Sequence, residues 1–464
     1  MKVKDILGFS IGPVGSAALS LLILPIITWF FSPSDVGRIS LLSTIVSFST
    51  LFFTLGLDQS YVRSYHETED RNALLKECFL PGAFVLCSVL FFAFVFDYRL
   101  ISSLIFDVES TLYSLGVILC IVLSFFSRFL ALNLRMKEKG FQYSLSQLLP
   151  KLGVLIVVLI YIYLNEIYEF SGLIIANIIS FTLTFATLVY LTQKSIRRSL
   201  PSVIDIDRLK NLIKFGFPLV FSSVAFWGLT SVDKVFIKVF STLDELGLYS
   251  VSVSFAGAAI VLQKIFSTIW APTVYKWCSE GRNLEKIPRI QEMITLIILV
   301  FFCLTGVFSW VIDYILPSDY IDVKYIVLSC MGFPLLYTLS ETTMIGIGVT
   351  KKSMFALIAS LIALAVNVIG NYFMIPLYGA AGAAVSTSIS FFVFFILRTE
   401  FSCLIWKRLP RMKMYILVLI SVSYSIFIAL FGSNYKIEII SLSWFFYLII
   451  ILFLYGTVVR ELMS

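Results

Sequence analysis

Apolar residues fill this chain in fourteen long segments separated by short polar gaps. A stretch of about 20 mostly apolar residues can cross the ~30 Å hydrocarbon layer of a membrane as one helix. The longest gaps, 59–77, 193–211 and 272–288, are too short for an independent domain, which usually needs about 50 residues. The pattern therefore predicts an all-α integral membrane protein with about fourteen transmembrane helices. The predicted spans are 6–31, 38–58, 78–96, 110–131, 140–163, 171–192, 212–236, 247–271, 289–312, 323–347, 353–375, 379–397, 414–431 and 438–458.

The chain also repeats itself at a spacing of 210 residues. FSPSDVGRIS at 31–40 resembles FSTLDELGLYS at 240–250, and Gly37 and Gly247 occupy matching places. The same offset relates Tyr168, Gly172 and Ser180 to Tyr378, Gly382 and Ser390. The offset predicts two six-helix lobes in parallel orientation, related by a pseudo-two-fold axis along the membrane normal. The expected divisions are an N-terminal lobe 1–192, a cytoplasmic linker 193–211, a C-terminal lobe 212–398 and two additional helices in 399–464.

Lys and Arg residues concentrate in every second gap between the spans. Counted from the N-terminus, 26 of the 35 cationic residues lie in alternate gaps and 6 in the intervening ones. Because cationic residues near span ends are retained in the cytoplasm, both termini are expected there. Topology and anionic lipid then account for the net charge of +7, and no nucleic-acid partner is expected. We expect a multi-pass protein of the bacterial cytoplasmic (inner) membrane.

Three cations lie within predicted spans, where an ionised side chain is costly and usually faces a protein interior or a watery cavity. Lys151 is the strongest candidate, because it lies about 12 residues, or ~17 Å, into its span and follows Pro150. Arg128 and Lys264 are nearer the cytoplasmic ends, where snorkelling towards water is an equal alternative. With Arg63 they predict a cationic cavity that favours an anionic, phosphate-bearing ligand. The alternatives for Lys151 are a buried structural ion pair and a lysine that snorkels towards water.

Other polar residues near the spans are candidates for polar contacts or ion coupling. Asp58 lies near the end of a span. Asp233 and Lys234, which are adjacent in the sequence, also lie near a span end, and an ion pair between them at the membrane interface is the simpler interpretation. Glu341 lies within a span and could titrate or pair with a cation. Asn367 and Asn371, one helical turn apart, are expected either to bind sugar hydroxyls or to bond neighbouring helices.

Missing motifs argue against several functions. The chain contains no G-x-x-x-x-G-K-[ST] run and no H-E-x-x-H motif, and its one histidine, His66, lies in a predicted loop. No metal site and no cofactor are therefore expected. Its seven cysteines form no C-x-x-C pair and are expected to pack as small apolar residues. A membrane glycosyltransferase or polysaccharide polymerase would be expected to carry catalytic residues on a sizeable external loop. Because every external gap here is short, enzyme function is disfavoured.

Three stretches carry a resemblance to a known family: GLDQSYVRSYHE at 56–67, the segment 216–258 beginning GFPLVFSSVAFWGLTSVDK, and PLYGAAGAAVSTSIS at 376–390. They resemble the polysaccharide biosynthesis branch of the multidrug/oligosaccharidyl-lipid/polysaccharide exporter superfamily, and are most similar to Wzx-type O-antigen and capsule repeat-unit flippases. The resemblance implies an undecaprenyl-pyrophosphate-linked oligosaccharide, turned from the cytoplasmic to the periplasmic leaflet. It also implies that Arg63, Lys151 and Lys264 bind the pyrophosphate while the polyprenyl tail stays among membrane lipids. The first span lacks the arginine found in lipid II flippases, which weakens that alternative.

The expected mechanism is alternating access, driven by removal of product or by a proton or sodium gradient. Two alternatives remain: a drug/cation antiporter of the same superfamily, and a non-transporting scaffold of a polysaccharide-assembly complex. A polysaccharide polymerase and glycosyltransferases are the expected protein partners.

Overall fold

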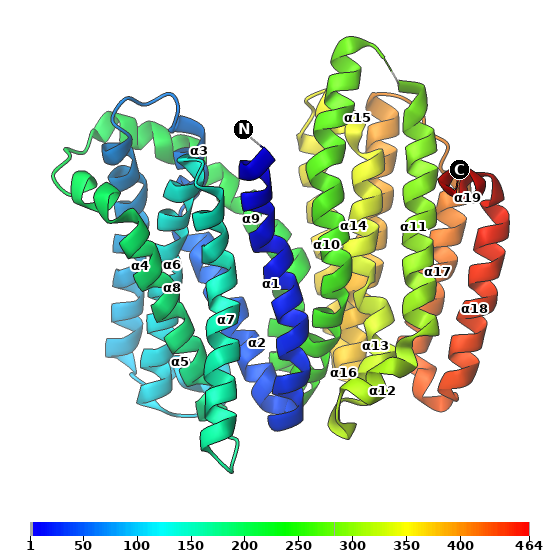
Figure 1. Ribbon diagram of the computed structural model, residues 1–464, viewed down its shortest axis with the longest axis horizontal. Helices are drawn as coiled ribbons and strands as arrows, with labels where there is room; N and C mark the ends of the chain where they lie inside the picture. The colour runs from blue at the N-terminus through cyan, green and yellow to red at the C-terminus, as the bar shows by residue number, and fades with distance from the viewer. Residues whose placement is uncertain (1–2, 283, 464) are drawn as a thin grey trace. The chain divides into compact units, whose positions relative to one another are not determined.

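The computed structural model describes residues 3–282 and 284–463, which fold into helices joined by short turns (Figure 1). The long helices are α1 (Val3–Phe30), α2 (Pro33–Phe53), α4 (Arg71–Phe96), α6 (Thr111–Met136), α7 (Gly140–Leu164), α8 (Phe170–Ser199), α9 (Ile206–Phe240), α10 (Leu243–Glu280), α11 (Ile287–Val307), α16 (Met354–Ile405), α17 (Met412–Phe431) and α18 (Ile437–Leu454). The shorter helices are α3 (Leu57–Ser64), α5 (Leu100–Phe106), α12 (Ile312–Ile315), α13 (Val323–Cys330), α14 (Gly332–Thr343), α15 (Ile345–Val349) and α19 (Gly456–Met463). Four 3-10 turns are η1 (Leu284–Lys286), η2 (Ser309–Val311), η3 (Ser318–Tyr320) and η4 (Gly432–Asn434).

Twelve helical runs in the described ranges are long and apolar enough to cross a membrane, and α10, bent by 46°, is a thirteenth. The 52-residue α16 counts once among them, although its backbone leaves the helical conformation at Gly379 and so divides it into two arms. With those arms taken separately, each of the fourteen predicted spans has its helix. The predicted all-α, multi-pass membrane fold is confirmed.

Several helices extend beyond the apolar segments that predicted them. Helix α10 continues to Glu280 rather than ending near 271, and α3 lies largely inside the predicted gap 59–77. Hydropathy marks the part of a helix that sits in lipid. The backbone ladder can continue into water, because Lys, Glu and Gln are good helix formers. Span length and helix length are therefore different quantities in this chain.

The chain divides into two compact units. The first unit comprises Met1–Phe31 and Arg38–Trp227, and the second comprises Ser32–Gly37 and Gly228–Ser464. The first therefore contains α1, most of α2, α3 to α8 and the start of α9. The second contains the first turn of α2, the end of α9 and all later helices. The lobe and linker boundaries expected from the sequence remain a prediction.

Helix boundaries follow the 210-residue offset. The matching pairs are the ends of α1 and α9 (Phe30, Phe240), the starts of α2 and α10 (Pro33, Leu243), and the starts of α8 and the second arm of α16 (Phe170, Ala380). These matches place helix ends at equivalent sequence positions in the two halves. The repeat is thus a repeat of local structure as well as of residues.

Two glycines with this offset allow a reciprocal close contact within the second unit. A Cβ added at Gly37 would lie 2.2 Å from the carbonyl oxygen of Leu243, and one at Gly247 would lie 2.0 Å from that of Pro33. Leu243 and Pro33 are themselves 210 residues apart. Because any side chain would collide with the opposite backbone, only glycine lets the first turns of α2 and α10 approach this closely.

The break in α16 depends on another glycine. Gly379 has φ 51° and ψ −125°, a conformation that residues with a Cβ rarely adopt. A carboxylate oxygen of Glu245 in α10 accepts a hydrogen bond from the backbone N–H of Ala380 at 2.7 Å. This contact satisfies one of the backbone donors left free where the second arm begins, and the negative charge favours a helix N-terminus.

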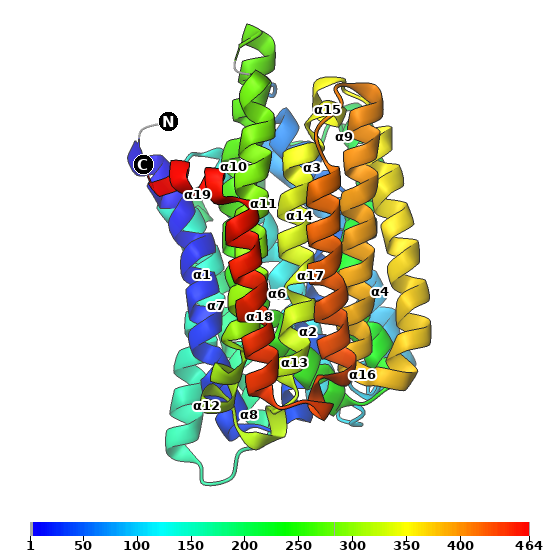
Figure 2. The same cartoon turned by 90° about the vertical axis from the view of Figure 1, so that its right-hand side faces the viewer.

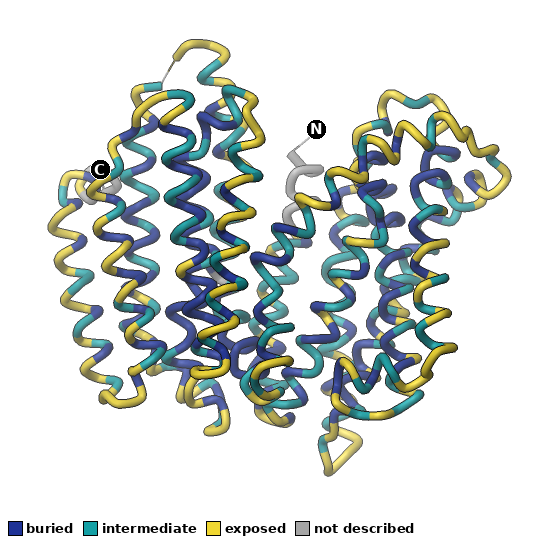
Figure 3. The backbone as a smooth tube through the Cα atoms, turned by 180° about the vertical axis from the view of Figure 1, so that it is seen from behind, coloured by how far each residue is buried: buried dark blue, intermediate teal, exposed yellow. Residues whose placement is uncertain are grey.

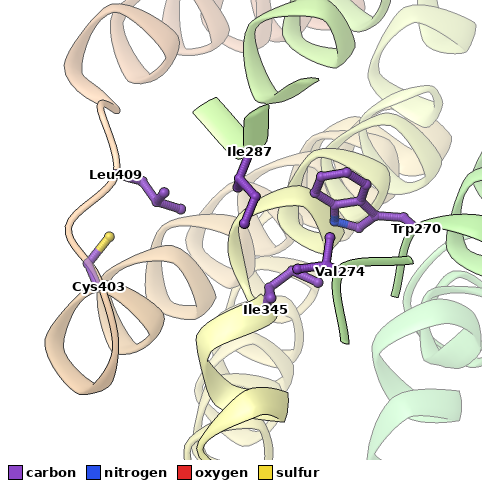
Figure 4. Packing of buried hydrophobic residues seen from close by; sticks show 6 residues of the cluster. All are labelled: Trp270, Val274, Ile287, Ile345, Cys403 and Leu409. Atoms are coloured by element: carbon purple, nitrogen blue, oxygen red, sulfur yellow. The ribbon is translucent and has the colours of Figure 1, made fainter. Parts of the chain in front are cut away.

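Apolar side chains are both buried within each unit and exposed on its outside. In the second unit Trp270, Val274, Ile287, Ile345, Cys403 and Leu409 form a buried cluster (Figure 4). Exposed positions recur along the outer helices (Figure 3), and Phe96 and Phe453 are each 85% exposed. Such apolar surface would be costly in water, but it suits helices whose solvent is lipid.

Candidate functional site

Helix α3 brings two of the predicted residues to one place in the first unit. The chain turns sharply between α2 and α3, where Leu55 and Gly56 both have positive φ angles of 51° and 70°. Asp58, one residue into α3, is buried, whereas Arg63 at its last turn is exposed. The break therefore turns one face of a short helix into the unit and leaves its end accessible.

Arg128 of α6 is paired with Asp58. Its Nη2 lies 2.8 Å from Asp58 Oδ2, and the Arg128 side chain is 40% exposed. The other carboxylate oxygen, Oδ1, accepts a hydrogen bond from the backbone N–H of Gln59 at 2.9 Å. Because the pair compensates much of the charge on Arg128, this guanidinium has less to offer an external anion than an unpaired one. From the sequence, Asp58 and Arg128 are separate candidates, and the structure joins them as an ion pair.

Arg63 and Lys151 have no acidic partner among the described residues. The guanidinium carbon of Arg63 lies 4.1 Å from the centroid of the Phe215 ring, a cation–π contact that leaves the edge N–H groups available. Lys151 lies within α7 with an exposed side chain, and neither a hydrogen bond nor an ion pair to its ammonium occurs in the described part of the chain. Lys264 of α10, in the second unit, is exposed in the same way.

The helix around Lys151 is fixed by its neighbour α8. The carbonyl of Pro150 accepts a hydrogen bond from Ser180 Oγ at 2.5 Å, and Gly153, one turn on, lets Ser180 approach closely. Pro150 and Gly153 thus lie on the α8 face of α7. Lys151 lies about 100° away from Pro150 around the helix, so it points away from that packed face.

Polar residues that the sequence analysis considered apart meet at Asp233 of α9, in the second unit. The Asp233 side chain is fully buried, and each carboxylate oxygen accepts two hydrogen bonds. Oδ1 accepts from the amides of Asn367 at 3.0 Å and Asn371 at 2.6 Å. Oδ2 accepts from Thr387 Oγ1 at 2.7 Å and Tyr249 Oη at 2.8 Å.

This Asp233 cluster, defined as Asp233 with its four partners, is rich in oxygen atoms and has one carboxylate. Asn371 Oδ1 is buried and has no hydrogen-bond partner among the described residues. Rotation of either side-chain amide would turn an oxygen inwards. Hard monovalent cations and protons are the species that such a set of oxygens attracts. Lys234, the next residue of α9, is partly buried.

Glu341 of α14 is paired with a residue that the sequence analysis assigned to a loop. Arg398 Nη2 lies 2.9 Å from Glu341 Oε1, and Arg398 Nη1 donates to Ser340 Oγ at 2.7 Å. Both charged side chains are almost buried, with exposures of 6% and 11%. Because the predicted span stopped at 397 and α16 continues to Ile405, Arg398 lies inside the helix.

An aromatic surface in the first unit was also missed. The rings of Phe48 in α2 and Trp227 in α9 have centroids 4.7 Å apart, and the indole N–H of Trp227 donates to Ser47 Oγ at 3.2 Å. Phe52, one turn along, stacks on Phe48 and is 42% exposed. Aromatic residues are common in membrane helices, so the sequence alone carried no signal that singled these out.

No group of three or more His, Cys, Asp and Glu side chains suited to a metal ion occurs among the residues that the structure describes.

The profile of the family described as "Polysaccharide biosynthesis protein" matches residues 3–277, more than half of the chain. This chain belongs to the polysaccharide biosynthesis protein family. The resemblance noted in the sequence is thereby confirmed.

One relative of this polysaccharide biosynthesis family member is the probable low-salt glycan biosynthesis flippase Agl15 of Haloferax volcanii. It is 24% identical over 206 residues, which cover 43% of this chain and 43% of the relative. The chain therefore matches less than half the length of that protein.

Two solved structures share the fold. The lipid II flippase MurJ in an inward closed conformation superposes with a TM-score of 0.71 at 17% identity, covering 98% of this chain and 99% of MurJ. An inward-facing multidrug resistance MATE family transporter of the MOP superfamily gives 0.55 at 15% identity, covering 86% and 95%. At these identities the likeness concerns the fold alone.

Proposed function

We propose that this protein is a flippase for lipid-linked glycans. The observation that carries the proposal is a set of cations that have no acidic partner among the described residues of this polysaccharide biosynthesis family member. Lys151 and Lys264 lie on helices long enough to cross a membrane, and Arg63 lies on the short helix α3. A charge in such a place is retained only where it has a use. Supporting context comes from a relative that is described as a probable glycan biosynthesis flippase.

The pyrophosphate of the carrier lipid is the group that these cations bind. Arg63 offers two edge N–H donors while Phe215 covers one face of its guanidinium, a geometry that suits a phosphate oxygen pair. Lys151 supplies a point charge within α7. Arg128 has a weaker role in this proposal, because Asp58 already pairs with it. Lys264 of α10, in the second unit, is a separate candidate cation.

The glycan and the lipid tail need different surroundings. Sugar rings present apolar C–H faces that stack on aromatic rings, and the Phe48–Trp227 pair provides such a face in the first unit. The polyprenyl tail needs only lipid or exposed apolar helix surface. Specifically, we assign the substrate as an undecaprenyl-pyrophosphate-linked oligosaccharide repeat unit of an O-antigen, capsule or similar surface polymer. It moves from the cytoplasmic to the periplasmic leaflet by alternating access.

In this proposal the protein lies in the bacterial inner membrane with both termini in the cytoplasm. Glycosyltransferases build the repeat unit before it is transported, and a polymerase consumes it afterwards. Consumption of the product alone would drive net transport if no ion is coupled.

The Asp233 cluster takes the role of the coupling site. A fully buried carboxylate with four neutral donors has no opposing charge in its immediate set of partners. Binding one proton or one sodium ion would neutralise it and alter all four hydrogen bonds. Neutralisation of this kind can shift the balance between two conformations of a transporter. Glu341 is less suited to this role, because Arg398 already neutralises it.

Lys151→Ala tests the flippase assignment. Purified protein is reconstituted in liposomes with fluorescent undecaprenyl-pyrophosphate N-acetylglucosamine, and its movement between leaflets is followed by quenching from one side. We expect Lys151→Ala to abolish movement and Lys151→Arg to retain part of it, because the arginine keeps the charge. In cells, Lys151→Ala should remove the surface polysaccharide at unchanged protein level.

Lys210→Ala is the matched control. Lys210 also belongs to the first unit, but it is 71% exposed and pairs with Asp207 on the surface, so its loss should leave transport unchanged. The cation-binding assignment would be refuted if Lys151→Ala moved the lipid between leaflets as fast as the wild-type protein does. It would also be refuted if Lys151→Ala and Lys210→Ala lost transport to the same extent.

A further inference from the structure

A cavity of about 610 Å³ opens in the second unit, away from the residues assigned above. It lies between the end of α11, the turns η2 and α12, and the start of α18. We call it the α11–α18 cavity. The lining residues that matter here are Trp310, Asp313, Tyr314, Glu438, Ser441 and Phe445. In Figure 2 α12 lies at the lower end of the unit, and the cavity lies at that end.

The sequence creates this cavity by ending one helix early. Gly306, near the end of α11, lets the ring of Trp444 lie directly against the α11 backbone, where an added Cβ would be 2.3 Å from the indole. Trp444 is fully buried, so it fixes α18 beside α11. Helix α11 then ends at Val307 and the chain turns away through η2. The first turns of α18, which contain Glu438 and Ser441, therefore face η2 and the short helix α12 across the cavity.

Of the two acidic side chains that line the cavity, one has no ion-pair partner in the described part of the chain. Asp313 Oδ2 lies 2.9 Å from Lys324 Nζ, so that carboxylate is already paired. Glu438 is exposed in the first turn of α18 and forms no ion pair within the described ranges. Ser441 Oγ, one turn further on, is shielded from solvent and has no hydrogen-bond partner among the described residues. An unpartnered hydroxyl and a free carboxylate in one cavity indicate that a ligand with hydrogen-bond donors completes it.

Aromatic rings form the rest of the wall. Trp310 and Tyr314 meet edge to face, with centroids 5.8 Å apart and an interplanar angle of 84°. Tyr314 is 78% exposed and Phe445 is 47% exposed, so their ring faces are open to a ligand. Aromatic faces beside a carboxylate attract ammonium groups by cation–π contact and charge together. The same surroundings would repel a phosphate or a carboxylate.

The depth of the cavity restricts the ligand further. Helix α18 has 18 residues and is therefore about 27 Å long, close to the thickness of the hydrocarbon layer. Its first turn must lie at the boundary between headgroups and acyl chains. Trp and Tyr side chains favour that boundary. From there Leu442 and Phe445 continue the cavity wall towards the hydrocarbon, with exposed apolar side chains.

We infer that the α11–α18 cavity binds the headgroup of a membrane lipid that carries an ammonium group. The ammonium lies between Glu438 and the aromatic rings, and Ser441 Oγ accepts one of its hydrogen bonds. The acyl chains follow Leu442 and Phe445 into the hydrocarbon. Lys436, exposed two residues before Glu438, is available to the lipid phosphate at the rim. This lipid site is separate from the proposed flippase site and does not depend on it.

Native mass spectrometry of the full-length protein measures this binding. The protein is titrated with phosphatidylethanolamine and with phosphatidylglycerol of the same acyl chains, and lipid adducts are counted at each concentration. We expect wild-type protein to bind phosphatidylethanolamine about tenfold more tightly, which corresponds to about 1.4 kcal/mol. Glu438→Gln should reduce that preference to less than about twofold, because the charge is lost and the shape is kept.

Controls separate the site from general charge and from misfolding. Glu280→Gln removes one acidic charge from a surface pair with Lys276 elsewhere in the second unit and should keep the preference. Unchanged thermal unfolding of Glu438→Gln shows that the variant is folded. The inference fails if wild-type protein does not distinguish the two lipids, or if Glu438→Gln retains the preference. It also fails if Glu280→Gln loses the preference equally. A further refuting result would be that soluble glycerophosphoethanolamine, which lacks acyl chains, competes for the cavity as well as phosphatidylethanolamine does.

Discussion

Replacing Asp233 by alanine and by asparagine separates packing from charge at the buried carboxylate of α9. Alanine removes both oxygens and with them four buried hydrogen bonds, donated by the Asn367 and Asn371 amides and by the hydroxyls of Thr387 and Tyr249. Asparagine keeps the shape and one acceptor oxygen. The two variants therefore differ mainly in how many donors remain satisfied.

The expected difference can be estimated from the hydrogen bonds. Each buried hydrogen bond in a membrane protein contributes about 0.6 kcal/mol on average and at most about 1.7 kcal/mol. At about 1 kcal/mol for each of four donors, Asp233→Ala should lower the free energy of unfolding by about 4 kcal/mol. In Asp233→Asn the amide oxygen serves Asn367 and Asn371, and the new NH₂ group donates to Thr387 and Tyr249, whose hydroxyls can accept. That variant should lose no more than about 1 kcal/mol, because it also no longer buries a charge.

Equilibrium unfolding in mixed detergent and dodecyl sulfate micelles, followed by circular dichroism, measures these free energies. The same titration in sodium chloride and in choline chloride tests for a bound ion. If sodium binds at Asp233, a concentration 100 times the dissociation constant stabilises wild-type protein by about 2.7 kcal/mol. Asp233→Asn should lose that response, and its transport should no longer depend on an ion gradient.

Two results would refute this reasoning. Equal destabilisation by alanine and asparagine would mean that the hydrogen bonds to Asp233 contribute little and that the side chain acts through its volume. Transport by Asp233→Asn that still responds to sodium and proton gradients as wild type does would exclude the Asp233 cluster as the coupling site.

Asp58→Asn and Arg128→Gln should each destabilise the protein, and the double variant should lose less free energy of unfolding than the sum of the two single losses. Because Arg128 is 40% exposed, we expect a coupling energy of about 1 kcal/mol. Additive losses would contradict an ion pair between the two residues. Gly37→Ala should lower stability by about 2 kcal/mol, because the added Cβ would lie 2.2 Å from a carbonyl oxygen. Gly257→Ala, where nothing lies within 4 Å of the added Cβ, is its control and should be neutral or stabilising in thermal unfolding; equal losses would refute the contact. Gly379→Ala should cost about 1–2 kcal/mol, since its φ of 51° is strained for alanine, and an unchanged melting temperature would contradict this.

The spans and the repeat could be predicted because both depend on local sequence. Crossing lipid requires about 20 apolar residues in succession, so hydropathy located all fourteen segments. The 210-residue offset was visible at Gly37 and Gly247 because a close backbone contact permits only glycine. Helix ends in water were less predictable, since helices continue wherever the backbone ladder is favourable. The end of α10 at Glu280 is one such case.

Pairing of polar residues was decided by the tertiary structure. Asp233 and Asn371 are 138 residues apart, and Arg128 and Asp58 are 70 apart. Nothing in the local sequence specifies which distant helix a buried polar side chain will face, because the partner depends on how helices pack. Lys151 was identifiable as an unusual charge from sequence alone, because its position within an apolar span is a local property of the sequence. The proposed function rests on the absence of an acidic partner for Lys151 among the described residues, and this became apparent only when the surrounding helices were in place.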